Sequence, residues 1–96
     1  MGAINTNRKG SAAERRSMAI LEAAGYTCVR SSGSHSIWDI WGYSATGFVL
    51  CQVKSGNWPG SVETEGLRLA VVPPNCLKLV HRWRAGQKAP DVRVLG

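Results

Sequence analysis

The sequence predicts a single-domain α/β protein whose elements follow the order α-β-β-β-α-β. Three observations predict it: a segment with helical apolar spacing comes first, three strand-like segments follow, and a second helical segment precedes a fourth strand. The chain has 96 residues, which leaves little room for a second hydrophobic core. We therefore expect residues 1–96 to form one domain.

The first helix is expected to follow a polar arm. Residues 1–10 are polar and basic, which favours a flexible basic arm. Ser11 lies three positions before Glu14, the spacing of a capping box, and apolar residues then recur at helical intervals. Gly25 supplies a C-terminal stop. This pattern predicts a helix over residues 12–24.

Three strand segments come next. Residues 26–32 (YTCVRSS) alternate as a half-buried strand does, and residues 36–44 (SIWDIWGYS) and 47–55 (GFVLCQVKS) give two more strands. The short connection over residues 44–47 contains a glycine, which predicts an antiparallel hairpin. Because the third segment is nearly all apolar, we expect it to be a central strand covered on both faces.

The C-terminal third adds a helix and one or two strands. A short helix is predicted over residues 62–70, weakened by Gly66 and ended by the prolines at 73–74. Residues 76–84 alternate, which places Trp83 in the core or in a dimer interface, although its basic and aromatic neighbours also suit nucleic-acid contact. Residues 92–95 close the chain as a short strand or a tail.

Charge and composition narrow the class of partner. The formal net charge is +6 and the pI is near 9.8, a balance that favours a polyanion such as nucleic acid. Ribosomal, membrane-surface and heparin-type binders share this basicity, so motifs must separate them. No apolar run approaches the roughly eighteen residues of a membrane span, and the N-terminus lacks the apolar core of a signal peptide. We expect a cytoplasmic protein without membrane contact, with three free cysteines.

Three polar residues are predicted to meet on the hairpin. Antiparallel pairing brings Gln52 and Lys54, which share one face of their strand, beside Asp39. An isolated Asp and Lys in strands most often form only an ion pair. Here Glu14 adds a carboxylate from the helix, and carboxylate with amide or peptide oxygens suits a hard divalent cation. A lysine alongside stabilises negative charge or orients an attacking water, so the pattern indicates phosphodiester hydrolysis.

The same residues give the chain a family resemblance. A Glu on the first helix, an Asp on the second strand and (Glu or Gln)-x-Lys on the third resemble the PD-(D/E)xK nuclease superfamily. More narrowly, RKGSAAERR, GYTCVRSSGSHSIWDIWGY and CQVKSG are similar to the archaeal-type Holliday junction resolvases and their phage relatives. The resemblance covers most of residues 8–58, and the C-terminal third matches in element order only. It implies a restriction-endonuclease-like fold with a mixed central sheet flanked by helices.

The resemblance also implies roles for individual residues. Asp39 would be the principal metal ligand, Gln52 would stand where many members have Glu, and Lys54 would be the catalytic lysine. Glu14 would assist the metal or the water, the backbone carbonyl of Val53 would be a further ligand, and Ser34 would lie near the scissile phosphate. The implied cofactor is Mg²⁺, with Mn²⁺ as the alternative, and no organic cofactor. Basic residues near the site are candidates for phosphate contacts, with a solvated helix face as the alternative for single arginines; they are Arg8, Lys9, Arg15, Arg16 and Arg30.

Gln52 is the departure from the family pattern. An amide oxygen can coordinate Mg²⁺ but brings no charge, so we expect weaker metal binding than at a Glu site. Glutamine does occur at this position in active branches of the superfamily, which favours a working variant. The alternatives are a nuclease for flaps, nicked or single-stranded DNA, and an inactive homologue that only binds DNA.

The implied substrate bears on the assembly. A four-way DNA junction presents two equivalent strands, so a resolvase that makes paired nicks needs two active sites in symmetric relation. We therefore expect a homodimer that acts on four-way junctions in recombination and repair, in a prokaryotic or phage-infected cell.

Overall fold

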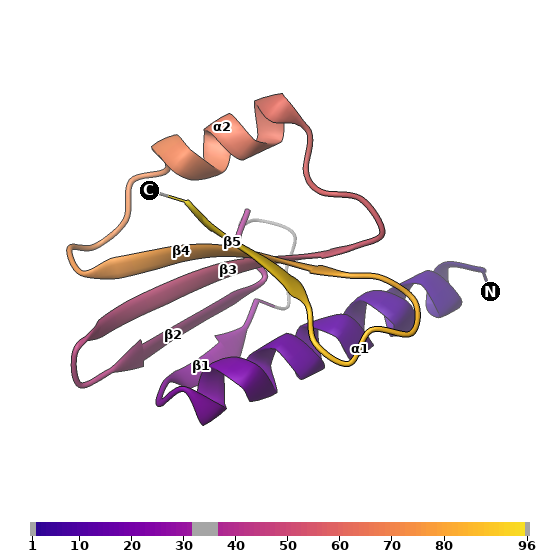
Figure 1. Ribbon diagram of the computed structural model, residues 1–96, viewed down its shortest axis with the longest axis horizontal. Coiled ribbons are helices and arrows are strands. Elements are labelled where there is room, and N and C mark those ends of the chain that lie inside the picture. Colours follow the sequence, from indigo (N-terminus) through magenta and orange to yellow (C-terminus); the bar gives the residue numbers. More distant parts are fainter. Residues whose placement is uncertain (1, 32–36, 96) are drawn as a thin grey trace.

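The computed structural model describes residues 2–31 and 37–95, with side chains from residue 12 onward. A five-stranded sheet lies between two helices, α1 on one face and α2 on the other (Figure 1). The elements are α1 (Gly2–Ala23), β1 (Thr27–Arg30), β2 (Ile40–Ser44), β3 (Gly47–Ser55), α2 (Ser61–Leu69), β4 (Cys76–Trp83) and β5 (Asp91–Leu95). The predicted element order is confirmed, and residues 91–95 form a strand.

The sheet is mixed, with β3 at its centre. The strands lie in the order β1-β2-β3-β4-β5. The pairs β1–β2, β2–β3 and β4–β5 are antiparallel, whereas β3 and β4 are parallel and are joined through α2. The predicted hairpin over residues 44–47 is present, with Ser44 paired to Gly47. This arrangement brings the last residues of β3 close to the start of β2 and to the segment that enters α2.

The first helix begins ten residues before the position predicted for it. It starts at Gly2 instead of residue 12, so the backbone of residues 2–10 belongs to α1. No proline interrupts this stretch, and adding residues to a formed helix is far easier than nucleating one. The predicted stop holds: Gly25 has φ 106°, and the amide of Tyr26 donates to the carbonyl of Leu21 at 3.1 Å, as in a Schellman motif.

Each face of the sheet has its own apolar core. Leu21 of α1 packs against a first cluster formed by Ile40, Val49, Cys51 and Leu79. Leu67, the one buried residue of α2, packs on the other face in a second cluster formed with Trp38, Val80 and Leu95. None of the helices within residues 2–31 and 37–95 combines the length and the hydropathy that a membrane span requires.

Trp83 lies in the core and is 5 % exposed. Its indole Nε1–H donates to Ser17 Oγ at 2.7 Å, and His81 Nδ1 lies 2.9 Å from the same oxygen. Burial lowers the pKa of His81, which favours the neutral ring. This buried group therefore fixes α1 to β4 and has a structural part, away from the hairpin residues.

Candidate active site

The start of β2 places Asp39 directly against the end of β3. The Asp39 amide donates to the carbonyl of Cys51 at 3.0 Å, and its Oδ2 accepts the amide of Val53 at 2.7 Å. Ile40 pairs with Cys51, so the register brings Asp39 opposite Gln52. The short hairpin sets this register, because its connection leaves no freedom for the strands to slide. The structure therefore brings Asp39 beside the segment from Gln52 to Lys54, as the alternation predicted.

Gln52 is buried, and its two amide atoms differ in their surroundings. Nε2 donates to the carbonyl of Ile37 at 3.3 Å and to Glu63 Oε2 at 3.0 Å. Oε1 has no hydrogen-bond partner, and it is the one buried side-chain polar atom in that condition among the described residues. An unsatisfied buried acceptor costs about 1–3 kcal/mol, so such an atom calls for an explanation.

The donor set fits a divalent cation. An uncharged amide oxygen, a carboxylate and a peptide carbonyl are all hard oxygen ligands of the kind that Mg²⁺ accepts. Within the side chains described, no group of three or more His, Cys, Asp or Glu lies close enough to hold a metal ion. A cation here would therefore depend on mixed donors, with Asp39 and the Gln52 Oε1 as the side chains that would hold it and Val53 supplying its carbonyl.

Lys54 lies on the same face of β3 as Gln52, two residues along. Its Nζ pairs with Glu63 Oε1 at 3.1 Å, and both side chains are partly exposed. Glu63 stands in the first turn of α2, which follows β3 after a short loop. The ammonium is thereby held at the C-terminal end of β3 near Asp39, where its charge offsets part of the rise that burial causes in the pKa of Asp39.

Glu14 reaches the site from α1. Arg30 of β1 holds it with two contacts to Oε1, from Nη2 at 3.1 Å and from Nε at 3.2 Å. Burial raises the pKa of Glu14, the nearby charge of Asp39 raises it further, and Arg30 lowers it. Two carboxylates that interact electrostatically are thus brought together from elements far apart in the sequence.

Burial also raises the pKa of Asp39 above its ordinary value. The hydrogen bond from Val53 and the charge of Lys54 lower it in part, while Glu63 raises it. The ionised carboxylate is therefore an unfavourable component of the apo fold, as is common for residues kept for function and not for stability.

Asp39→Asn should raise the melting temperature in EDTA at neutral and alkaline pH. Because the folded-state pKa is raised, the folded protein binds this proton more tightly than the unfolded chain, and ionisation costs stability as pH rises through that pKa. The asparagine avoids this cost and keeps an oxygen to accept the Val53 amide. For a domain of this size, each ~1 kcal/mol corresponds to roughly 4–8 °C. Thermal melts from pH 3 to pH 8 should show a gain that disappears at acid pH, and a variant less stable at pH 8 would contradict this assignment.

Several predicted site residues cannot be placed, and the basic residues that can be placed differ in their contacts. Ser34 lies outside the described residues, as do the side chains of Arg8 and Lys9, whose backbone belongs to α1. Arg15 is exposed on α1. Arg16 lies over the Trp83 ring at 4.0 Å and donates to the carbonyl of Gln87 at 2.6 Å. Arg30 contacts Glu14, and its role in the structure is to position the Glu14 carboxylate.

The structure adds site residues that sequence reasoning missed. Glu63 is one, and a carboxylate in the first turn of the helix after the QxK strand is the signal that points to it. Arg82 is another, because the parallel pairing sets it beside Lys54. Its guanidinium also lies 4.6 Å from the Trp58 ring, over which Arg93 packs at 4.0 Å. Strand alternation alone could not show which strand Arg82 would join.

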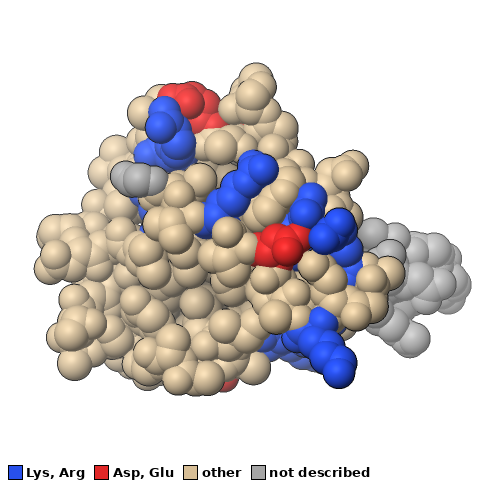
Figure 2. Space-filling view, in the orientation of Figure 1, with Lys and Arg blue, Asp and Glu red and all other residues tan. Residues whose placement is uncertain are grey.

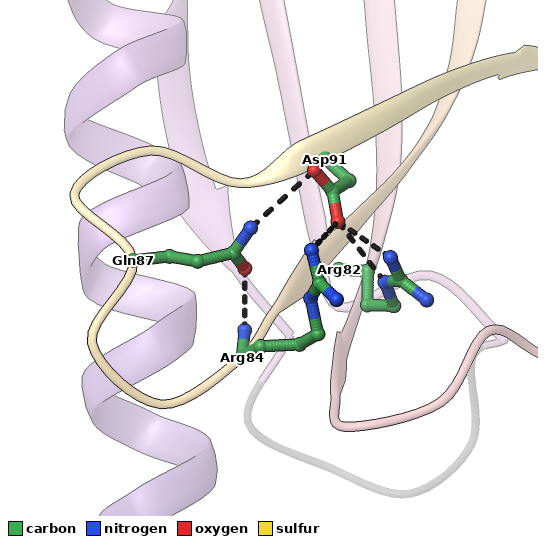
Figure 3. A network of polar contacts seen from close by, with 4 residues as sticks. All are labelled: Arg82, Arg84, Gln87 and Asp91. Atoms are coloured by element: carbon green, nitrogen blue, oxygen red, sulfur yellow. Dashed lines mark hydrogen bonds and ion pairs between the residues drawn. The ribbon is translucent and has the colours of Figure 1, made fainter.

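The turn between β4 and β5 is organised around Asp91 (Figure 3). Its Oδ2 accepts Arg82 Nη2 at 2.6 Å and lies 3.5 Å from Arg84 Nη2. Gln87 donates to Asp91 Oδ1 at 3.4 Å and accepts the amide of Arg84 at 2.6 Å. The hydrogen bond from Arg82 lowers the pKa of Asp91. Two arginines are thus held in place near the end of the site.

A basic hollow adjoins the segment that follows Lys54. A cavity of about 630 Å³ lies between α1, the end of β3 and the β4–β5 turn, and is lined by Ala12, Ala13, Arg16, Ser55, Gly56, Trp83, Arg84, Ala85 and Gly86. Figure 2 shows Lys and Arg side chains at the top, centre and right of this face, whereas the lower left, over the β2–β3 hairpin, is mostly uncharged. On the face in view, positive charge therefore lies mainly away from the hairpin.

Comparison with known proteins identifies the fold. No protein-family model matches the chain, and no curated protein matches its sequence. The chain is similar in structure to Hjc of Archaeoglobus fulgidus, a Holliday junction resolvase from an archaeal hyperthermophile. The TM-score is 0.65 at 20 % identity, and the match covers 91 % of this chain and 71 % of that chain. The chain thus has the mixed α/β fold of a resolvase structure, as the sequence resemblance predicted.

Proposed function

We propose that this protein is a metal-dependent endonuclease that resolves four-way DNA junctions by making paired nicks. The observation that carries the proposal is the buried, unpartnered Oε1 of Gln52 on the hairpin opposite Asp39, with Lys54 two residues along the same face. The fold shared with Hjc and the positive charge of the chain support a DNA substrate.

The residues divide the work of phosphodiester hydrolysis. A bound Mg²⁺ supplies a Lewis acid and a water of lowered pKa, and Mn²⁺ is the alternative ion. Asp39 provides charge to hold the ion, with the Gln52 amide and the Val53 carbonyl as neutral donors. Lys54 stabilises the negative charge that develops on the phosphate. Glu14, held by Arg30, assists in holding the ion or the water.

DNA is proposed to lie along the basic side of the molecule. Arg16 and Arg84 line the hollow next to the residues that follow Lys54, and Arg82 lies beside Lys54 on β4. Guanidinium groups form charge-assisted hydrogen bonds with phosphate oxygens, so these three side chains are candidates for contacts with the DNA backbone. Arg15, which is exposed on α1, would extend this surface.

A cleavage assay on four DNA structures of the same sequence tests the proposal. A labelled four-way junction, a flap, a nicked duplex and a single strand would each be incubated with Mg²⁺, Mn²⁺ or EDTA. We expect metal-dependent nicks in the junction and none in EDTA. Preferred cleavage of flaps, nicked duplex or single strands would support a related nuclease with another substrate, and tight junction binding without cleavage in either metal would support an inactive DNA-binding homologue.

The proposed dimer uses an apolar area of the sheet beside α2. Trp41 and Tyr43 lie on one face of β2, and their register partners place Val29 and Phe48 on the same face. All four side chains remain between 42 % and 49 % exposed. A contiguous apolar area of this kind is typical of a protein interface. A second copy would cover it and place two active sites in the two-fold relation that paired nicks require.

Trp41→Ser should convert the dimer into a monomer. Loss of a central aromatic anchor typically costs at least ~2 kcal/mol of association free energy, which weakens the dimer roughly thirty-fold or more. Sedimentation velocity across a concentration series measures this, with Val62→Ser as a control because Val62 is 87 % exposed on α2. A wild-type chain that sediments as a monomer at every concentration would contradict the proposed assembly.

A further inference from the structure

Glu63 contacts two side chains of the candidate site, the neutral Gln52 and the charged Lys54. Its Oε2 accepts Gln52 Nε2 at 3.0 Å, and its Oε1 pairs with Lys54 Nζ at 3.1 Å. It comes from α2, which Leu67 anchors to the second core cluster. One carboxylate thus spans the two side chains that lie on the same face of β3.

This contact determines which atom of the Gln52 amide faces the site. Both hydrogens of Nε2 are engaged, one by Glu63 and one by the carbonyl of Ile37 at 3.3 Å. A flipped amide would bring Oε1 against two acceptor oxygens, and the charged one would repel it most. Oε1 therefore stays on the other side, buried and without a partner.

The orientation matters because Gln52 has no charge of its own. An amide presents either an oxygen, which attracts a cation, or an NH₂ group, which repels it. A Glu at this position would offer an oxygen in either orientation, whereas a Gln does so in only one. A fixed orientation is thus a requirement that arises from the substitution of Gln for Glu.

The ion pair between Glu63 and Lys54 positions the lysine more than it stabilises the fold. Both side chains are partly exposed, at 33 % and 42 %, and ion pairs of that kind contribute little to stability. What the contact does is hold the ammonium on the side of β3 where Asp39 lies, instead of leaving a long flexible side chain to sample solvent.

We propose that Glu63 is a positioning residue. It orients the Gln52 amide so that its oxygen faces the candidate cation site, and it holds Lys54 beside that site. The inference rests on the proposed function. It extends the active site to α2 and explains how a chain with Gln in place of Glu keeps a working ligand. Groups that orient a metal ligand typically change metal affinity by about 10–100-fold when removed.

Mn²⁺ binding to the DNA-free protein tests the inference, measured by electron paramagnetic resonance. We expect Glu63→Ala to weaken Mn²⁺ binding at least about ten-fold. Glu63→Gln should retain most of the affinity, because its carbonyl oxygen still accepts one hydrogen of the Gln52 amide. Glu65→Ala is the matched control, since Glu65 lies on the same helix and its partner among the described residues is Arg68, at 3.0 Å. It should bind Mn²⁺ as the wild type does.

Two results would overturn the inference. If Glu63→Ala binds Mn²⁺ as tightly as the wild type, the contact does not orient a ligand. If Glu63→Gln and Glu63→Ala lose affinity equally, Glu63 acts through its charge and not through the amide. Thermal melts of each variant in EDTA establish that all of them fold, as expected for an exposed position in the first turn of a helix.

Asp39→Asn in the same titration separates this inference from the proposed function. If Asp39→Asn abolishes Mn²⁺ binding while Glu63→Ala leaves it unchanged, the cation site stands and only the part of Glu63 is wrong. If neither substitution changes Mn²⁺ binding, the cation does not bind at this place, and both proposals fail.

Discussion

Asp39→Asn is expected to reduce junction cleavage in Mg²⁺ by at least about a hundred-fold while leaving junction binding nearly intact. The substitution removes the charge that would hold the ion, and losses of this size are typical when one electrostatic group of an active site is removed. The asparagine keeps the hydrogen bond from Val53, so the hairpin should not move. Single-turnover cleavage and a binding titration on the same junction measure the two effects separately.

Glu22→Gln is the matched control for that substitution. Glu22 is an exposed carboxylate in the last turn of α1, away from the hairpin contacts, and its loss changes the net charge equally. It should cleave as the wild type does. Equal activity of Asp39→Asn and the wild type would remove Asp39 from the site, and a parallel loss in both variants would indicate an effect of overall charge.

Leu67→Ala should destabilise the protein by about 2–5 kcal/mol, the usual cost of truncating a fully buried leucine. Leu67 is 1 % exposed and is the one buried residue of α2. Small domains have only about 5–15 kcal/mol of stability in total, so the loss is a large part of it. Because α2 carries Glu63, we also expect a loosened helix to disturb the Gln52 and Lys54 contacts.

Urea unfolding measures this loss, and Leu69→Ala provides the comparison. Leu69 lies two residues along the same helix but is 70 % exposed, so its truncation should change stability by less than about 0.5 kcal/mol. If both variants unfold at the same urea concentration, α2 is not anchored through Leu67.

Local sequence patterns predicted the hairpin part of the site. The register of β2 and β3 depends on the short connection at residues 44–47 and on alternation with period two, and both are properties of adjacent residues. Placing Asp39 opposite Gln52 therefore required no knowledge of the rest of the fold. The position of Glu14 followed from the family resemblance, and the structure adds Arg30 as the group that holds it.

The contributions of α2 and β4 could not be predicted in this way. Glu63 reaches Gln52 only because the connection through α2 returns the chain parallel to β3, and Arg82 meets Lys54 through the same crossover. Such contacts depend on tertiary packing and on the choice of strand partner, neither of which has a signature in a local pattern. The predicted start of α1, at residue 12, was also wrong. A capping-box spacing marks a favourable place for a helix to begin, but it does not prevent the helix from beginning earlier in the chain.

Strand-mapped cleavage of a four-way junction by the wild type and by Lys54→Ala, with Lys88→Ala as the control, tests whether the hairpin residues form the active site. Lys88 is exposed in the β4–β5 turn, so its removal leaves the hairpin untouched. We predict symmetric, Mg²⁺-dependent nicks by the wild type and Lys88→Ala, and a loss of about a hundred-fold or more for Lys54→Ala with junction binding retained. Unchanged nicking by Lys54→Ala, or nicks that persist in EDTA, would contradict an active site built on Asp39, Gln52 and Lys54.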